Sequence, residues 1–507
     1  MALLYSAGAT FGVRRVAEID VLSSTIEQIG KDLRAGKYTT QALTSFYLDR
    51  IKALNDELQC FVHIDEGRAM RQAAAADERL AAGETGALLG IPIANKDNIS
   101  RAGALTTSGS RILGGYTAPY SATVIERLEA AGAIILGTTN MDEFGMGSSN
   151  ENSAYGPVLN PWSKDRVPGG SSGGSAAAVC AGLCAAALGS DTGGSLRQPA
   201  AYTGLVALKP SYGRVSRWGL VAFGSSLEQI GPLARSAADA AHLLQVMAGP
   251  DPRDANCAHA VVPDYVAGLE QADLRGTKIG IAEEYFVEDI EAEVKAAVEA
   301  AIELLSQLGA VIYPVSLPST QYALPTYYLI ASSEASANLA RYDGIRYGQR
   351  ETGKSLGEVY QNTRTRGFGS EVKRRIMLGT YALSAGYYDA FYGKASQVRD
   401  LIQAEFEQVF QTVDLLVTPT APTTAFRLGE KLADPLQMYL ADAFVLPANL
   451  AGICGISIPC GFDLAGLPIG LQLLAPAFAE ANLLQAAHRY QQETDWHLRR
   501  PTAIEKD

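Results

Sequence analysis

The sequence predicts a layered α/β fold with a mixed or mostly parallel sheet, built as one large domain over residues 1–507. Three observations support this prediction. The chain has 507 residues with 47% hydrophobic content, which suffices for a large buried core. Short apolar runs typical of strands alternate with longer segments of helical periodicity. Strand-like runs also lie on both sides of residues 249–275, the best candidate for a domain boundary.

Residues typical of helix starts and helix ends indicate where the individual elements lie. Ser24 and Glu27 have the spacing of a capping box, which begins a helical N-terminal region over about residues 20–60. Ser236 is expected to cap another helix, and Gly309 to end a long amphipathic one. The other expected elements are helices at 121–132 and 291–308, a buried helix in the alanine-rich run that holds Cys180 and Cys184, and strands at 88–94, 133–136, 278–282, 310–315, 413–417 and 470–474.

Composition and charge argue against several classes of protein. The formal net charge of −12 argues against a broad basic surface for nucleic acid. No uninterrupted apolar run reaches the roughly 18 residues of a membrane span, and residues 1–15 lack the charged start of a signal peptide. The cysteines have no zinc-binding spacing, so we expect no metal and buried thiols in a cytoplasmic protein. These are Cys60, Cys180, Cys184, Cys257, Cys454 and Cys460.

Three motifs between Gly90 and Gly231 hold the residues best suited to catalysis. Ser195 follows two glycines, Gly193 and Gly194, whose backbone can curl so that successive N–H groups point at one spot, as an oxyanion hole requires. Lys96 follows an apolar strand, where burial would bring its pKa from about 10.4 to the roughly 7 that a general base needs. The motifs are GIPIANKDN at 90–98, PGGSSGGS at 168–175 and GSDTGGSLRQP at 189–199.

Each motif also has a simpler interpretation. A glycine- and serine-rich run is often a loop or a phosphate-binding cradle, and a lysine after a strand is usually a solvated end. A Ser–His–Asp triad is the obvious rival mechanism, and separation along the chain does not exclude it. However, the histidines all lie outside the glycine-rich and polar motifs: they are His63, His242, His259, His488 and His497.

Residues 348–355 match the P-loop pattern, but we interpret them as a surface loop. A P-loop follows a buried strand and precedes a helix. The segment before this match, residues 338–347, is polar and mixed in character. We therefore expect no nucleotide site there.

Taken together, the three motifs resemble the amidase signature family. Lys96 precedes Ser171 by 75 residues, and Ser171 precedes Ser195 by 24. The resemblance covers about residues 20–490, with the signature core at about 85–235. It implies an α/β/α sandwich around a large mixed, mostly parallel sheet. It also implies a nucleophile at Ser195, a bridging serine on a cis peptide bond at Ser171, a base at Lys96, and an oxyanion hole at Thr192, Gly193 and Gly194.

Within that family, the chain is most similar to the glutaminase subunits of tRNA-dependent amidotransferases. The similarity lies in four stretches, at residues 332–348, 367–375, 418–426 and 434–442. For the region of about 320–445 it implies a glutamine pocket. Arg375 would bind the α-carboxylate, Asp442 the α-ammonium, and Tyr327 would line the pocket. Without the resemblance, Arg375 is interpreted as a solvated helix charge beside Lys373 and Arg374.

The resemblance also implies partners. Ammonia from glutamine would pass to a tRNA-binding kinase subunit that uses ATP and Mg, with a small third subunit completing the complex. This chain would carry no cofactor and meet tRNA only indirectly; its substrate complex would be Glu-tRNA(Gln), Asp-tRNA(Asn) or both. A free-standing amidase and a non-catalytic scaffold are the alternatives. One departure from the family pattern is Asn95, where an apolar residue is usual beside the lysine.

Overall fold

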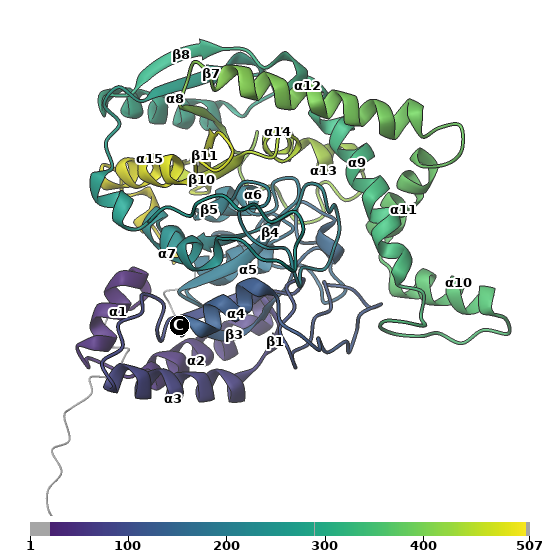
Figure 1. Ribbon diagram of the computed structural model, residues 1–507, viewed down its shortest axis with the longest axis horizontal. Helices are drawn as coiled ribbons and strands as arrows, with labels where there is room; N and C mark the ends of the chain where they lie inside the picture. Colours follow the sequence, from purple (N-terminus) through teal and green to yellow (C-terminus); the bar gives the residue numbers. More distant parts are fainter. Residues whose placement is uncertain (1–20, 288, 503–507) are drawn as a thin grey trace, which may run out of the picture.

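A computed structural model describes residues 21–287 and 289–502, and its centre is one eleven-stranded sheet (Figure 1). The strand order is β1-β3-β2-β4-β6-β5-β10-β11-β9-β7-β8. The bounds are β1 (Phe61–Ile64), β2 (Pro92–Lys96), β3 (Ile134–Thr139), β4 (Ala186–Asp191), β5 (Val206–Lys209), β6 (Gln229–Ala234), β7 (Lys278–Ala282), β8 (Val311–Val315), β9 (Leu415–Pro419), β10 (Cys454–Phe462) and β11 (Pro468–Ala475).

The sheet is mixed, as predicted, but it is not mostly parallel. Four of the ten neighbouring strand pairs are parallel, and these lie toward the two ends of the sheet. Six pairs are antiparallel, and five of them are consecutive through the centre. A tight turn with Gly466 at φ 79° joins β10 to β11, and such a short connection forces antiparallel pairing. The sequence prediction missed β1, β4, β5, β6 and β10, and with them most of the antiparallel part.

Helices flank this sheet and pack against it. For example, α5 packs on β4, α7 on β6, and both α8 and α15 on β10 and β11. The bounds are α1 (Ile26–Arg34), α2 (Thr40–Leu58), α3 (Glu66–Ala81), α4 (Thr123–Ala130), α5 (Gly173–Cys180), α6 (Arg197–Thr203), α7 (Ala237–Met247), α8 (Ala292–Gln307), α9 (Ala323–Asn338), α10 (Leu356–Gly367), α11 (Ser370–Ala382), α12 (Lys394–Val409), α13 (Pro435–Leu440), α14 (Leu446–Leu450) and α15 (Glu480–Gln492). Strands before and after residues 249–275 share the one sheet, which supports our proposal of a single domain.

Several of the predicted element boundaries are confirmed. The Ser236 side chain caps α7 by accepting a hydrogen bond from the Asp239 N–H at 3.0 Å. The long helix α8 ends just before Gly309, whose φ of 101° is the left-handed conformation that stops a helix. The predicted strand at 278–282 coincides with β7.

Three local predictions are wrong. The N-cap of α1 is Thr25 and not Ser24, because the Thr25 hydroxyl accepts from the Gln28 N–H at 3.2 Å. The strand expected from residue 88 begins at Pro92, because Gly90 at φ 81° makes a turn first. The helix expected to hold both Cys180 and Cys184 ends at Cys180, so Cys184 lies beyond it.

Other predictions from composition can be compared with the described residues. Residues 348–355 lie between a short 3-10 turn at Leu339–Arg341 and α10, with no preceding strand, so the surface-loop interpretation is confirmed. All six cysteines are buried free thiols. Among the helices described, none is long and apolar enough to cross a membrane. The expectation about a signal peptide concerns residues 1–15, which lie outside the described residues.

Helices α9 and α11 pack backbone to backbone on one side of the molecule (right side of Figure 1). The contact depends on Gly379 of α11, where an added Cβ would lie 1.9 Å from the carbonyl oxygen of Ser332 on α9. This close approach joins the helices that carry two residues of the predicted glutamine pocket, Tyr327 on α9 and Arg375 on α11.

We expect Gly379→Ala to lower the free energy of unfolding by about 1–3 kcal/mol, because the helices must separate to admit the methyl group. Chemical denaturation measures this. Gly357→Ala is the matched control, since Gly357 also lies in a helix and its added Cβ would meet nothing closer than 3.9 Å. Alanine is the better helix former, so the control should be neutral or slightly stabilising. Equal stabilities for the two variants would contradict the packing argument.

Candidate active site

The sheet topology brings two of the three sequence motifs to one edge. Lys96 is the last residue of β2, and Asp191 is the last residue of β4. These strands are parallel neighbours, so their carboxyl ends meet at the same edge of the sheet. Ser195 lies in the turn between β4 and α6, and Ser171 lies just before α5. The peptide bond between Gly170 and Ser171 is cis, as the resemblance implied.

The Lys96 ammonium is fully buried among serine hydroxyls. Its Nζ lies 2.8 Å from Ser171 Oγ, 2.8 Å from Ser172 Oγ and 3.0 Å from Ser190 Oγ. The Ser172 N–H donates to the Ser195 carbonyl at 3.2 Å, so the Ser195 turn lies directly beside this cluster. The structure therefore brings together the three residues that the resemblance assigned to catalysis.

Burial changes what Lys96 can do chemically. Loss of hydration lowers its pKa to about 7, and the charges of Asp142 and Asp191 offset only part of that effect. An amine with this pKa is substantially neutral at physiological pH. It can accept a proton from a neighbouring hydroxyl, which an ordinary surface lysine cannot do.

Asn95, the departure from the family pattern, does not disturb this burial. It is buried in β2, and its Nδ2 donates to the Ile99 carbonyl at 2.7 Å. The Asn95 side-chain amide therefore stabilises the turn that follows Lys96.

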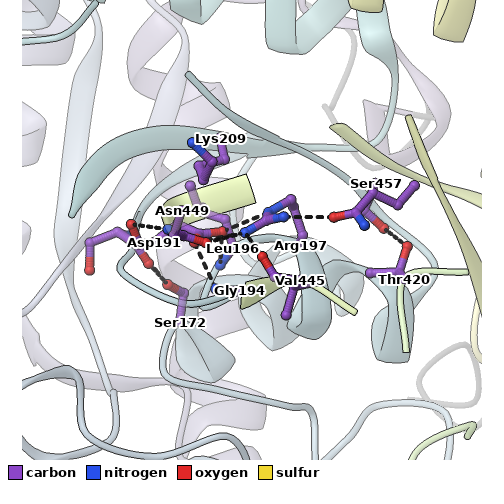
Figure 2. Close-up of polar contacts among 12 residues, drawn as sticks. Ser172, Asp191, Gly194, Leu196, Arg197, Lys209, Thr420, Val445, Asn449 and Ser457 are labelled. Atoms are coloured by element: carbon purple, nitrogen blue, oxygen red, sulfur yellow. Dashed lines mark hydrogen bonds and ion pairs between the residues drawn. The ribbon is translucent and has the colours of Figure 1, made fainter. Parts of the chain in front are cut away.

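The Ser195 turn is held by a fully buried ion pair between Asp191 and Arg197 (Figure 2). Asp191 Oδ1 accepts from the Gly194 N–H at 2.7 Å, and Oδ2 accepts from the Leu196 N–H at 3.2 Å. Burial opposes ionisation of Asp191, but the charge and hydrogen bonds of Arg197 lower its pKa to about 2. The carboxylate is thus fixed as an acceptor for the backbone on both sides of Ser195.

Arg197 also connects this turn by hydrogen bonds to residues distant along the chain. It donates to the Val445 carbonyl at 2.9 Å and to Asn449 Oδ1 at 2.6 Å (Figure 2). It also donates to Gln472 Oε1 on β11 at 2.6 Å. Val445 in turn packs on the turn so closely that a Cβ at Gly194 would lie 2.1 Å from its Cγ2. Glycine at position 194 is therefore a steric requirement.

One predicted member of the oxyanion hole needs correction. The Gly194 N–H already donates to Asp191, so it is not free to bind an oxyanion in this structure. Within the described residues, the N–H groups of Thr192, Gly193 and Ser195 donate to no protein acceptor. We therefore propose these three as the candidate oxyanion donors.

The three residues of the predicted glutamine pocket are all buried. Arg375 is 2% exposed, so the solvated helix charge that was its alternative interpretation is wrong. Tyr327 lies against the Ser195 turn, because a Cβ at Gly193 would be 2.5 Å from its Cζ. Burial raises the pKa of Tyr327, and the nearby Arg375 charge acts in the opposite direction. Tyr327 is thus near both the Ser195 turn and Arg375.

Asp442 has an unfilled acceptor. Its Oδ2 receives a hydrogen bond from Ser148, while its Oδ1 is buried without a partner. Burial raises its pKa to about 8, against the opposing effects of Ser148 and Arg375. A buried carboxylate oxygen with no donor is costly, and a substrate ammonium group would satisfy it.

Three polar residues of this site were not singled out from the sequence. Ser190 and Asn98, whose side chains hydrogen-bond to each other beside Lys96, belong to motifs already recognised, so motif membership could have found them. Ser148 lies between motifs and carried no signal. Within the described residues, no histidine hydrogen-bonds or ion-pairs with Lys96, Ser171 or Ser195, and no group of three or more residues suited to a metal occurs.

This fold and site define an amidase, and the chain belongs to the Amidase family, which it matches over residues 42–484. It is 56% identical over 490 residues to a glutamyl-tRNA(Gln) amidotransferase subunit of Chloroflexus aurantiacus, covering 96% of this chain and all of the relative. The crystal structure of the corresponding subunit from Thermotoga maritima superimposes with a TM-score of 0.76 at 42% identity, covering 92% of this chain and 94% of that one. A peptide amidase crystallised with chymostatin gives a TM-score of 0.80 at 31% identity, covering 94% and 99%.

We expect Asp191→Asn to lower the free energy of unfolding by about 3–5 kcal/mol, because it leaves the buried Arg197 charge unpaired. Denaturant titration tests this. The control is Asp273→Asn, whose partner Arg275 is 83% exposed, so that water screens this pair and its loss should change stability little. If the two variants lose the same stability, the ion pair does not hold the turn.

Amide hydrolysis should depend on the ionisation of Lys96. Only the neutral amine accepts a proton, so for a simple amide without an α-ammonium group log kcat/KM should rise with pH up to about 7 and level off above it. Lys96→Ala should cost on the order of 10²-fold or more in rate and remove this limb of the profile. An unchanged limb in the variant would assign the titration to another group.

Proposed function

We propose that this chain is the glutaminase subunit of a tRNA-dependent amidotransferase, which hydrolyses glutamine and supplies ammonia for converting Glu-tRNA(Gln) to Gln-tRNA(Gln). The observation that carries the proposal is the pair of buried side chains, Arg375 and Asp442, close to the Ser195 turn: one is a cation, and the other becomes an anion when it loses its proton. A zwitterionic amino acid needs one fixed cation and one fixed anion, and this pocket offers both. The name of the relatives supports the same conclusion.

The proposed chemistry uses the Ser195, Ser171 and Lys96 side chains in sequence. The Ser195 oxygen attacks the side-chain amide carbon of glutamine, while its proton passes through the Ser171 hydroxyl to neutral Lys96. The N–H groups of Thr192, Gly193 and Ser195 receive the developing oxyanion. The amide C–N bond then breaks, and the proton returns to the nitrogen, which leaves as ammonia. Water attacks the acyl-enzyme by the same relay and releases glutamate.

Binding of glutamine would satisfy the polar groups left open in the pocket. The α-carboxylate pairs with Arg375, and the α-ammonium donates to the unpartnered Oδ1 of Asp442. Asp442 must lose its proton to become the partner of a cation, so substrate binding favours its ionised form. Tyr327 lines the pocket between Arg375 and the Ser195 turn.

The remaining steps of the amidotransferase reaction belong to partner subunits in this proposal. A tRNA-binding kinase subunit would hold ATP and Mg and activate the mischarged tRNA, and a small third subunit would complete the complex. The net charge of −12 suits a chain that meets tRNA only indirectly. The six free cysteines fit a cytoplasmic location. Asp-tRNA(Asn) is a second candidate substrate of the complex.

A free-standing amidase acting on another small amide is the second candidate. The observation that favours it is the fold itself, which superimposes on a peptide amidase as closely as on an amidotransferase subunit. The fold therefore does not select the substrate, and the groups that line the pocket must decide it.

Hydrolysis of L-glutamine, compared with that of butanamide, which lacks both α groups, tests the assignment. We expect a strong preference for glutamine and no activity of Ser195→Ala on either substrate, because the nucleophile is lost. Arg375→Gln should weaken glutamine binding by about 2–5 kcal/mol, since the substrate carboxylate stays desolvated and unpaired. It should leave butanamide hydrolysis nearly unchanged.

Ser163→Ala, a change of an exposed hydroxyl outside the site, controls for nonspecific effects of substitution. If the wild-type chain hydrolyses butanamide as well as glutamine and Arg375→Gln loses nothing, the free-standing amidase is correct.

A further inference from the structure

A second carboxylate is buried against the arginine that we propose to bind substrate. Glu371 lies one helical turn before Arg375 on α11, and Arg375 Nε donates to its Oε1 at 2.8 Å. The same oxygen accepts from the Tyr439 hydroxyl at 2.8 Å, and Oε2 pairs with Arg374. Both Glu371 and Arg375 are buried, so this is not a solvated surface pair.

Aromatic rings restrict the guanidinium further. Tyr328 and Tyr439 stack with their centroids 3.9 Å apart and their planes at 25°. The guanidinium carbon of Arg375 lies 4.9 Å from the Tyr328 centroid, 5.4 Å from that of Tyr439 and 5.8 Å from that of Phe223. These contacts limit the orientations open to a side chain that otherwise has many rotamers.

Hydrogen bonds made by Tyr439 connect Arg375 to Asp442, the two residues proposed to bind the α groups of glutamine. Tyr439 bonds Glu371 through its hydroxyl, and its carbonyl accepts from the Asp442 N–H at 3.1 Å. The chain from Arg375 through Glu371 and Tyr439 to Asp442 is therefore continuous. It couples the cation for the α-carboxylate to the anion for the α-ammonium.

We propose that Glu371 and Tyr439 are positioning residues that orient Arg375 and set its spacing from Asp442, and so determine the preference for α-amino acid amides. Glu371 engages Nε of the guanidinium, which leaves the edge formed by the two terminal nitrogens for the substrate carboxylate. A bidentate arginine–carboxylate pair requires one such edge in a fixed plane. This inference rests on the proposed function, because it concerns the same pocket.

For Glu371→Gln, a positioning role of the carboxylate and a purely electrostatic role predict opposite changes in the strength of glutamine binding. Removing a negative charge beside Arg375 makes the pocket more positive, which by Coulomb attraction alone would strengthen carboxylate binding. If the carboxylate instead fixes the guanidinium, its loss weakens binding in spite of the added positive charge. The sign of the change in KM therefore separates the two.

The test uses the full chain purified with its partner subunits and two substrates, L-glutamine and 4-aminobutanamide, which is glutamine without the α-carboxylate. For Glu371→Gln we expect KM for glutamine to rise on the order of tenfold, with kcat and the kinetics of 4-aminobutanamide little changed. Tyr439→Phe removes one hydroxyl and keeps the ring stack, and should raise KM for glutamine by about threefold.

Glu493→Gln is the matched control. It breaks another i,i+4 pair, with Arg489 at 2.7 Å at the end of α15, and should change neither substrate. Thermal unfolding of each variant shows whether it is folded, and Tyr439→Phe keeps the test decisive if Glu371→Gln is not. An unchanged or lower KM for glutamine in the folded Glu371 and Tyr439 variants would overturn the inference. Failure of the wild type to prefer glutamine would instead overturn the proposed function.

Discussion

Asp191 and Arg197 are both fully buried, and neither charge is tolerable there without the other. The pair therefore fixes the conformation of everything bonded to it. Asp191 holds the backbone on both sides of Ser195, and Arg197 holds β11 and the residues around Val445 and Asn449. Because of this one interaction, the proposed nucleophile, the middle of the sheet and the segment that carries Asp442 keep a fixed geometry.

Burial acts on the other charged groups of the site in a consistent way. It disfavours ionisation, so it lowers the pKa of Lys96 and raises that of Asp442. Neutral Lys96 suits the base role that we propose for it, and Asp442 is expected to hold a proton until a cation approaches. Asp191 escapes this effect because a buried arginine lies beside it. The same low dielectric thus gives three charged residues three different states, according to their nearest partners.

The proposed substrate pocket is assembled from elements that are distant along the chain. Helix α9 brings Tyr327, helix α11 brings Arg375 and Glu371, and the segment after α13 brings Asp442. The glycine contact between α9 and α11 allows their side chains to meet. The pocket adjoins the Ser195 turn through Tyr327 and Val445, which pack on Gly193 and Gly194. The residues proposed for substrate selection therefore pack directly against the turn that carries the proposed nucleophile.

The sequence by itself determined the α/β class, the motifs around Lys96, Ser171 and Ser195, and the elements whose signals are local, such as β7 and α8. These follow from hydrophobic period and from residue types at short spacing, which do not depend on the rest of the fold. Only the tertiary structure decided that the centre of the sheet is antiparallel, that the Gly194 N–H donates to Asp191, and that Arg375 is buried against Glu371. Strand pairing, burial and ion pairing arise between segments far apart in the chain, so no local pattern encodes them.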